Sequence, residues 1–391
     1  MSKRKSQKKI VFVGLSGGVD SAVSAALLKK DGYEVVGVFI KTWHPDFLVC
    51  NEEEERMDAM RVAAHLNIPF LTFDFSDVYK KEVADYMIAE YKVGRTPNPD
   101  VMCNKEVKFG AFLKKALSMG AAFVATGHYA KIRYTGGYTG VACDTQATPV
   151  YLIKGVDPSK DQSYFLWTLN QEQLSKILFP IGHLKKTEVR ILAKKFNLPV
   201  AEKKDSQGIC FLGAVDLKEF LKHYIKPKKG KVLNEKGEEI GFHDGAVFYT
   251  LGERHGFIIT KKTPTDGAYY VVGKDIKKNL LIVSQQNSGV PDVGRLSSPD
   301  VQRLERGTFR LINSLSSSVK LEQVNWISNV PEEGKKYNAQ VRYHGHFLDC
   351  KVKILSKEKA EVTFKNFVQV ASGQSCVIYN KDICLGGGVV V

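Results

Sequence analysis

The sequence predicts an α/β fold in which a parallel sheet covered by helices comes first, a small central domain second and a β-barrel last. Three observations support this prediction. Residues 10–30 read as a buried strand, a glycine turn and a helix. Residues 1–130 alternate β-rich apolar runs with helical patterns, which is typical of a parallel sheet. The last ~90 residues show regularly spaced strands with turn signals, which favours a small barrel.

Apolar periodicity and turn residues predict the helices and strands of the N-terminal part. In parallel sheets ligands bind at the carboxyl ends of the strands, and the glycine turn and Gly127-His128 are both expected at such ends. We expect strands at Ile10–Leu15, Tyr33–Lys41, Pro69–Phe75 and Ala121–His128, and helices at Glu52–Asn67, from a Ser76 cap to Tyr91, and at Lys105–Gly120.

The predicted secondary structure changes near Val215, where helical patterns are followed by short strands and turns. Pro291–Pro299, with its Gly and Ser, is the next boundary. We therefore expect domains at 1–213, 214–292 and 293–391. Within them we expect a hairpin over 131–155 turning at Thr135-Gly136-Gly137, and helices at Phe165–Ile177, Thr187–Phe196 and Leu217–Tyr224.

The composition describes a basic globular protein. The 391 residues are 43% hydrophobic and 25% charged, and 57 Lys and Arg against 42 Asp and Glu give a formal charge of +15. Such an excess favours a polyanionic partner, nucleic acid first, over a generally basic surface. No apolar run reaches the ~20 residues that span a membrane. The basic N-terminus lacks an apolar signal core, so we expect the cytoplasm.

The turn Ser16–Ser21 predicts a phosphate site. Two glycines permit a backbone path that a Cβ would hinder, and the turn leads into the positive end of a helix. Asp20 would repel phosphate unless magnesium is bound there. SGGVDS lacks the Lys of a P-loop and resembles the pyrophosphatase-loop signature of adenine nucleotide alpha hydrolase-like enzymes, which split ATP into AMP and pyrophosphate. The alternative is an ordinary strand–helix turn with Asp20 as the helix N-cap.

The cysteines suggest reactive thiols. Seven are present and none form C-x-x-C, so zinc-ribbon and ferredoxin spacings are absent. Cys103 follows the proline-rich stretch 94–102, and we expect it at the start of a helix beside Lys105, where a thiol's pKa falls. Cys210 lies in a second unusual loop, 205–212. The alternative for both is a buried structural cysteine.

With both cysteine loops in view, the chain resembles the tRNA-specific 2-thiouridylases. The paired PNPDxxCN and SQGICF stretches are specific to that family, whereas SGGVDS alone gives only the superfamily. The matching stretches, in family order, are GLSGGVDS (14–21), FIKTW (39–43), GRTPNPDVMCNKEVKFG (94–110), ATGHYA (125–130), KDQSYFLW (160–167), DSQGICFLG (205–213), VRYH (341–344) and the tail from residue 373.

The resemblance implies a reaction and its partners. ATP adenylates the C2 oxygen of a wobble uridine in tRNA and releases pyrophosphate, a cysteine persulfide delivers sulfur to C2, and AMP leaves. It implies ATP and Mg²⁺ as cofactors and tRNAs for Lys, Glu and Gln as substrates. A sulfur-donor protein, either a relay carrier or a cysteine desulfurase directly, would load the persulfide.

The resemblance also implies roles for single residues. Cys210 matches the persulfide carrier, Cys103 the partner thiol and Asp100 the acid/base. His128 could equally be a hydrogen-bonded core residue, and Arg342 and Tyr343 could lie on a solvated barrel strand. The implied ATP site comprises Gly14, Leu15, Ser16, Gly17, Gly18, Val19, Asp20, Ser21, Ile40 and Gly127; the implied tRNA contacts are Asn98, Pro99, Asp100, His128, Lys160, Asp161, Gln162, Arg342, Tyr343 and Gln374.

Three rival functions and one rival cofactor remain at this stage. An ATP-dependent amide or C–N ligase would not need two loop cysteines. An RNA-binding protein with a degenerate nucleotide domain would show a broken glycine turn. A 2-thiocytidine enzyme would use C-x-x-C pairs. An iron–sulfur cluster on Cys103 and Cys210 would need a third ligand, and no third cysteine has convincing spacing.

Overall fold

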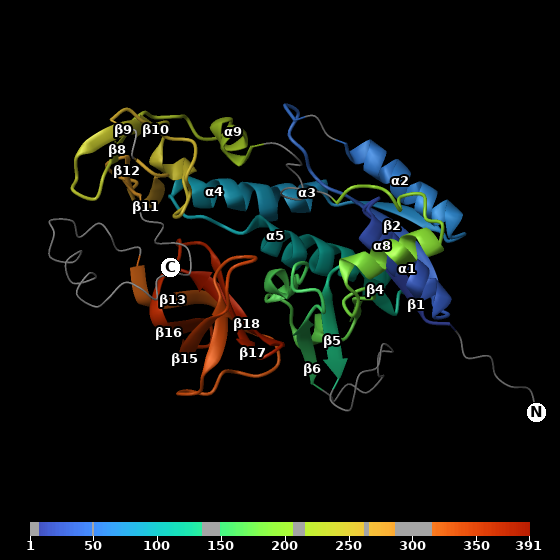
Figure 1. The fold of residues 1–391 in the computed structure, drawn as a ribbon. Helices are drawn as coiled ribbons and strands as arrows, with labels where there is room; N and C mark the ends of the chain where they lie inside the picture. Colours follow the sequence, from blue (N-terminus) through green and yellow to red (C-terminus); the bar gives the residue numbers. More distant parts are fainter. Residues whose placement is uncertain (1–7, 49–50, 135–148, 206–215, 262–265, 286–314) are drawn as a thin grey trace, which may run out of the picture.

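The computed structural model describes residues 8–48, 51–134, 149–205, 216–261, 266–285 and 315–391 (Figure 1). Its N-terminal sheet consists of β1 (Ile10–Gly14), β2 (Glu34–Lys41), β3 (Phe70–Asp74), β4 (Phe123–Ala125) and β7 (Ile177–Leu178). The order is β3-β2-β1-β4-β7 and every pairing is parallel. The predicted fold class is confirmed.

Strand β1 lies at the centre of the sheet, and its residues Val11, Phe12 and Val13 are at most 4% exposed. From β1 the chain runs outward first through β2 and β3 and later through β4 and β7. The strand order therefore reverses between β1 and β4. The crevice outside their carboxyl ends is where parallel sheets bind ligands.

The helices agree with the predicted ranges in part. The first two are α1 (Val19–Lys30) and α2 (Glu52–His65). Helix α1 packs against α8 (Lys186–Lys195), which comes much later in the chain. The predicted Ser76 cap is wrong by one residue, because Phe75 is the N-cap. The run that follows consists of α3 (Ser76–Tyr79), a π-helix η1 (Lys80–Asp85) and α4 (Tyr86–Lys92).

The helix predicted at Lys105 begins earlier, at Pro99. Its parts are α5 (Pro99–Met102), a π-helix η2 (Cys103–Phe112) and α6 (Leu113–Ser118). Asn98 caps it by accepting a hydrogen bond from the Val101 amide at 3.2 Å, and Pro99 needs no amide partner in the first turn. The prediction that Cys103 stands at a helix start is therefore wrong, because the helical run begins four residues before it.

The helix predicted over Phe165–Ile177 is wrong. The segment forms a 3₁₀ turn η3 (Ser163–Leu166), a short helix α7 (Gln171–Leu174) and strand β7. A capping box at Asn170 starts α7 afresh. The apolar residues that suggested one helix instead cover the space between the sheet and the barrel.

The central domain follows α9 (Leu217–Lys222) and contains one sheet in the order β10-β9-β8-β12-β11. A 3₁₀ turn η4 (Ala246–Phe248) precedes β10. The strands are β8 (Gly230–Leu233), β9 (Glu239–His243), β10 (Ile258–Ile259), β11 (Tyr270–Asp275) and β12 (Leu280–Ser284). The sequence-derived domain boundaries, after residues 213 and 292, fall outside the described residues.

The C-terminal strands close into a barrel, because β13 pairs with both β16 and β18. The hairpin predicted over 131–155 is confirmed by the antiparallel pairing of β5 with β6, while its turn lies outside the described residues. Strand β6 continues the barrel sheet by pairing with β18. The strands are β5 (Ala130–Tyr134), β6 (Val150–Lys154), β13 (Leu315–Trp326), β14 (Tyr337–Gln340), β15 (Leu348–Ser356), β16 (Lys359–Gln369), β17 (Ser375–Asn380) and β18 (Ile383–Val390).

No helix in the described ranges has the length and apolar character needed to cross a lipid bilayer.

Replacing Phe112 tests how far the sheet depends on the helix behind it. Phe112 is fully buried, and its ring centroid lies 6.3 Å from that of Phe73 on β3. We expect Phe112→Ala to lower the free energy of unfolding by about 3–5 kcal/mol, the usual cost of such a cavity. Phe367→Ala, at a 37% exposed barrel position, is the control and should cost far less. Urea denaturation measures both, and equal losses would contradict the assignment of the core.

Candidate active site

The glycine turn lies at the carboxyl end of β1 and opens into α1. Gly18 is the N-cap and offers no side chain to the helix, so the alternative of Asp20 as the cap is wrong. Gly17 has φ +72° and approaches α2 so closely that a Cβ would collide with the Glu55 carbonyl. Ser21 Oγ accepts from the Ser16 amide at 3.2 Å and donates to the Gly18 carbonyl at 3.1 Å. The turn is thus fixed around a helix N-terminus that suits an anion.

The other expected nucleotide residues lie on neighbouring strands. Gly14 and Leu15 end β1, Ile40 lies near the end of β2, and Gly127 follows β4. A Cβ on Gly127 would lie 2.8 Å from both the Asp20 carbonyl carbon and the Ser21 amide nitrogen. The structure therefore brings the expected residues together at the point where the strand order reverses.

Asp20 is held by two side chains from later in the chain. Lys186 Nζ lies 2.8 Å from both carboxylate oxygens, and the Tyr129 hydroxyl donates to Oδ1 at 2.8 Å. Burial and the negative charge of Asp20 raise the pKa of Tyr129 well above its usual range. Sequence analysis missed Lys186, since a lysine at a helix start far along the chain forms no local pattern. The signal was Asp20 itself, a carboxylate at an anion site that needs a cation.

The same lysine reaches Asp205, the last described residue before the Cys210 segment. Lys186 Nζ lies 2.8 Å from Asp205, Arg190 2.6 Å and Lys160 2.9 Å. Burial alone would raise the pKa of Asp205, but hydrogen bonds from Lys186 and Lys160 outweigh it and hold that pKa well below its usual range. Cys210 and the rest of 206–215 lie outside the described residues.

The segment expected to contact tRNA at 160–162 has mixed surroundings. Lys160 remains partly exposed while paired with Asp205. Asp161 accepts from the Gly155 amide at 2.8 Å and from the Ser163 amide and hydroxyl. Gln162 Oε1 accepts from the Tyr129 amide at 3.0 Å. The side chains of Asp161 and Gln162 therefore fix the local backbone, and Lys160 is the one that faces outward.

The segment that bears Asp100 and Cys103 is well supported. Pro99 is buried, Asp100 is half-buried, and its carbonyl accepts from Asn104 Nδ2 at 3.0 Å. Cys103 is 3% exposed and belongs to an apolar cluster that includes Tyr79 of α3 and Phe220 of the central domain. In this structure Cys103 is therefore a buried cysteine, which is the alternative that the sequence left open.

His128 also matches the alternative that the sequence left open. It is buried between the rings of Phe109 and Phe179, and Nδ1 lies 2.7 Å from the Thr126 hydroxyl. Burial, with a smaller contribution from the positive charge of Lys108, holds the pKa of His128 well below 6.5. The imidazole is therefore neutral near pH 7 and supplies no charge to a phosphate.

The barrel brings two expected residues, Arg342 and Tyr343, toward this domain. Arg342 is exposed and Tyr343 half-buried in the loop after β14, which ends at Gln340, so the barrel-strand alternative is wrong for both. The Tyr343 ring lies 4.4 Å from that of Phe165. Burial, then the negative charges of Asp161 and Asp100, raise the pKa of Tyr343 to about 12.

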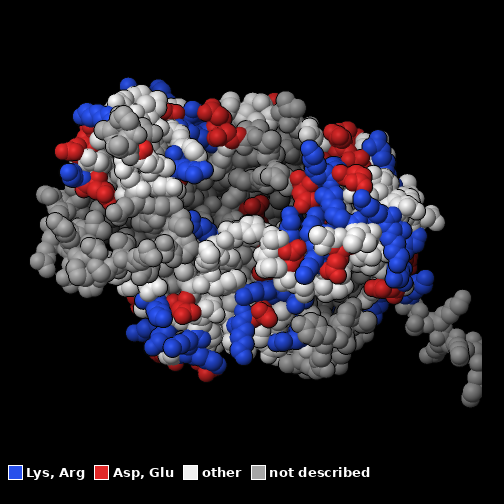
Figure 2. All heavy atoms as spheres, viewed as in Figure 1, with Lys and Arg blue, Asp and Glu red and all other residues white. Residues whose placement is uncertain are grey.

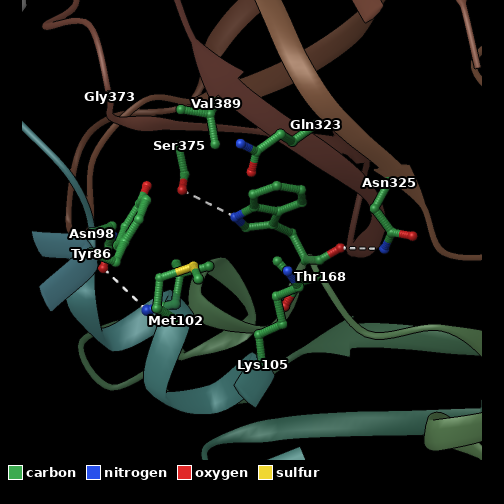
Figure 3. Close-up of a pocket in the computed structure, with 12 residues that line it drawn as sticks. Tyr86, Asn98, Met102, Lys105, Thr168, Gln323, Asn325, Gly373, Ser375 and Val389 are labelled. Atoms are coloured by element: carbon green, nitrogen blue, oxygen red, sulfur yellow. Dashed lines mark hydrogen bonds between the residues drawn. The ribbon is translucent and has the colours of Figure 1, made fainter. Parts of the chain in front are cut away.

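A cavity of about 150 Å³ lies between the α5–η2 helix and the barrel (Figure 3). Trp167 crosses it, donating through Nε1 to Ser375 Oγ at 3.0 Å, and its carbonyl accepts from Asn325 Nδ2 at 2.7 Å. Neither Asp100 nor Cys103 is among its described lining residues. Asn98, an expected tRNA contact, does line it, together with Val101 and Met102 of α5.

The charge is concentrated on parts of the surface. Figure 2 shows Lys and Arg side chains gathered over α1 and α8 and along the lower edge of the barrel. Lys185, Lys194 and Lys195, on α8 and its cap, are the exposed basic residues of this helix. Clusters of this kind suit a phosphate backbone.

Comparison with known proteins identifies the class. Family models described as a tRNA methyl transferase HUP domain, a tRNA methyl transferase PRC-barrel domain and an aminomethyltransferase β-barrel domain match residues 9–214, 218–285 and 316–390. A parallel sheet with a glycine loop where its order reverses, joined to these two domains, defines a nucleotide-dependent HUP-domain enzyme of tRNA modification.

The relatives identify the family within that class. The tRNA-specific 2-thiouridylase MnmA of Geobacillus thermodenitrificans is 42% identical over 394 residues, covering 100% of this chain and 96% of that protein. The Streptococcus mutans protein of the same name is 41% identical over 97% of this chain and 94% of its own length. The chain belongs to the tRNA-specific 2-thiouridylase family and is a tRNA-uridine 2-sulfurtransferase.

Solved structures are more distant. The U34-tRNA thiolase NcsA from Methanococcus maripaludis, with its [4Fe-4S] cluster, is 16% identical and aligns over 57% of this chain and 70% of its own, with a TM-score of 0.33. That likeness is too low to inform the mechanism of this protein.

The buried His128 makes stability depend on pH. Because its pKa is lower folded than unfolded, its contribution is complete above about 6.5 and is lost as the pH falls toward the folded value. We expect the melting temperature of His128→Gln to fall less than that of the wild type between pH 7 and pH 5. His346→Gln, at an exposed loop position, is the control and should retain the wild-type slope. Equal slopes in all three proteins would refute the assignment.

Proposed function

We propose that this protein uses ATP to replace the C2 oxygen of a wobble uridine in tRNA with sulfur, through Cys210 and Cys103. The main observation behind this proposal is that one domain contains both a glycine turn at a helix N-terminus and a capped helix that bears Asp100 and Cys103. This domain occurs in a chain that matches 2-thiouridylases over its whole length.

We also propose that the protein is located in the cytoplasm and that its domain boundaries lie near residues 213 and 292.

The first step activates a poor electrophile. The uridine O2 attacks the α-phosphate of ATP, an O–P bond forms and pyrophosphate leaves, so that AMP becomes the later leaving group. The turn 16–21 and Gly127 would hold the phosphates through backbone amides. A bound Mg²⁺ would spread the charge of the departing pyrophosphate. Asp20 supplies the oxygen ligands that Mg²⁺ prefers, but both oxygens lie 2.8 Å from Lys186, so the ion would share Asp20 with that lysine.

The second step transfers sulfur. The terminal sulfur of a Cys210 persulfide attacks C2, and AMP leaves with the former oxygen. The Cys103 thiolate then attacks the Cys210 sulfur, the S–S bond of the persulfide breaks, and a Cys103–Cys210 disulfide remains. A reductant restores both thiols before the next turnover. Asp100 is the proposed acid/base and base-contacting group, and Asn98 and Pro99 shape the pocket for the flipped base.

The buried state of Cys103 sets a condition on this step. A thiol that is 3% exposed in an apolar cluster cannot meet another sulfur without movement of its helix or of the groups that cover it. We therefore propose that binding of tRNA makes Cys103 more accessible than it is in the free protein.

We propose that tRNAs for Lys, Glu and Gln are the substrates and that a relay carrier or a cysteine desulfurase donates the sulfur. Lys160 and Arg342 are the proposed phosphate contacts, since both are at least partly exposed. Tyr343 is the proposed contact beside Asp100, with a phenol that burial keeps protonated. Asp161 and Gln162 would act by fixing the backbone around that contact surface, and His128 through its bond to the Thr126 hydroxyl.

The cysteine variants test the proposed chemistry. Purified protein, ATP, Mg²⁺, a persulfide source and unthiolated tRNA are mixed, and nucleosides are analysed by mass spectrometry. We expect ATP-dependent 2-thiouridine from the wild type and a loss of at least about a hundredfold in Cys103→Ser and Cys210→Ser. Cys376→Ser, at a buried barrel cysteine, is the control. Pyrophosphate release by the wild type without any thiolated base would instead favour the ligase alternative.

The charge of Arg342 should set affinity for tRNA. We expect Arg342→Ala to weaken binding and to reduce the slope of log K against log salt by about 0.7–0.9, the value for one lost phosphate contact. Filter binding at several salt concentrations measures the slope. Lys357→Ala, at an exposed barrel turn, is the matched control. An unchanged slope in Arg342→Ala would exclude it as a phosphate contact.

A further inference from the structure

We propose that the barrel turn Ser372–Gln374 positions the catalytic segment and that Gln374 is a positioning residue acting through Thr96, an inference that rests on the proposed function. The turn joins β16 to β17 and lies against the stretch that leads into α5. It thereby connects the barrel with Asn98, Asp100 and Cys103.

Two hydrogen bonds join the turn to one residue. The Thr96 amide donates to the Ser372 carbonyl at 2.8 Å, and Gln374 Nε2 donates to the Thr96 carbonyl at 2.8 Å. Thr96 is only 6% exposed, so both of its backbone groups are satisfied by the barrel away from water. A buried carbonyl that loses its donor costs more than the bond itself contributes.

The approach of the two backbones requires a glycine. Gly373 has φ +93°, and a Cβ on it would lie 2.9 Å from both the amide nitrogen and the carbonyl oxygen of Thr96. Real Cβ atoms do not approach backbone so closely, so any larger residue would push the turn away from Thr96. The contact is therefore specific to this pair of segments.

The contact lies two residues before the helix cap. Asn98 Oδ1 accepts from the Val101 amide, and this bond sets where α5 begins and where Asp100 lies. The next barrel residue supports the same region, since the Ser375 carbonyl accepts from the Tyr164 hydroxyl and Ser375 Oγ accepts from Trp167 Nε1, each at 3.0 Å. A shift of the turn would thus move the helix cap and the reacting groups with it.

Gln374 has a different use from the one that the resemblance implies. The Gln374 amide nitrogen donates a hydrogen bond to the Thr96 carbonyl, and this bond helps to hold Thr96 in place. Its loss should therefore lower the rate of the chemical step rather than the affinity for tRNA. Misplacement of a reacting group by about 1 Å can cost up to a hundredfold in rate.

Gln374→Glu is the first test, because it keeps the size of the side chain and replaces the donor with an acceptor. The matched control is Gln369→Glu, since Gln369 is another barrel glutamine whose Nε2 donates to a carbonyl of a neighbouring domain, that of Val272, at 3.4 Å. We expect Gln374→Glu to lower kcat for 2-thiouridine formation about tenfold or more, with KM for tRNA and the tRNA Kd within about twofold. Gln369→Glu should leave kcat unchanged. Gln374→Met, which adds no charge, repeats the test if the glutamate variant does not fold.

The outcomes are distinct. A raised KM or tRNA Kd with unchanged kcat would make Gln374 a tRNA contact and overturn the inference, as would equal losses of kcat in both glutamate variants or no change in either. Absence of thiolation by the wild type would count against the proposed function instead. In that case, iodoacetamide alkylation of Cys103, read by peptide mass spectrometry, still tests the positioning. It should be at least about threefold faster in Gln374→Glu, and an unchanged rate overturns the inference.

A glycine pair gives an independent test. Gly373 and Gly334 both have positive φ in barrel turns, at +93° and +81°, but a Cβ on Gly334 would meet no atom within 4 Å. Alanine at either position would have similar backbone strain, because both glycines have a positive φ. Only the Cβ of Gly373→Ala would also collide with Thr96. We expect Gly373→Ala alone to lower kcat, and equal kcat values in the two variants would overturn the inference.

Discussion

The ion pair between Asp20 and Lys186 is the interaction on which the site depends. A carboxylate at the positive end of α1 is stable there, but it opposes the binding of another anion. Lys186 Nζ, on a side chain only 14% exposed, lies 2.8 Å from Asp20 and also 2.8 Å from Asp205. A buried cation between two carboxylates keeps the local charge near balance. It also holds Asp205, the last described residue before Cys210, so the glycine turn and the start of the segment that contains Cys210 share one anchor.

The second constraint is the continuity of the barrel with the nucleotide domain. The hairpin β5–β6 belongs to the N-terminal part of the chain, yet β6 pairs with β18 and extends the barrel sheet. The segment between β6 and β7 is then held by barrel groups, including Ser375 and Asn325. Backbone hydrogen bonds across a domain boundary leave little freedom for relative motion. The barrel is therefore part of the scaffold that holds the segment between β6 and β7.

The fold could be predicted from the sequence because its signals are local. Buried β-rich runs, the glycine turn and regular strand spacing are each readable within a short window. The failures have physical causes. Pro99 and the Asn98 cap start a helix before its apolar pattern begins, and the Asn170 capping box divides a run whose apolar spacing looked continuous. Lys186 and Gln374 act through partners more than a hundred residues away, Asp20 and Thr96, and no local pattern encodes such pairs. The burial of His128 and Cys103 depends on packing in the same way.

Two of the predicted contact residues come from different domains. Asp100 comes from the first domain and Tyr343 from the barrel, and they lie close enough for the carboxylate to contribute to the raised pKa of the phenol. A phenol with a pKa of about 12 remains a hydrogen-bond donor at neutral pH, whereas a nearby carboxylate accepts. Neither domain alone supplies both groups, which gives a physical reason why the resemblance to 2-thiouridylases extends over the whole chain and not only over the nucleotide domain.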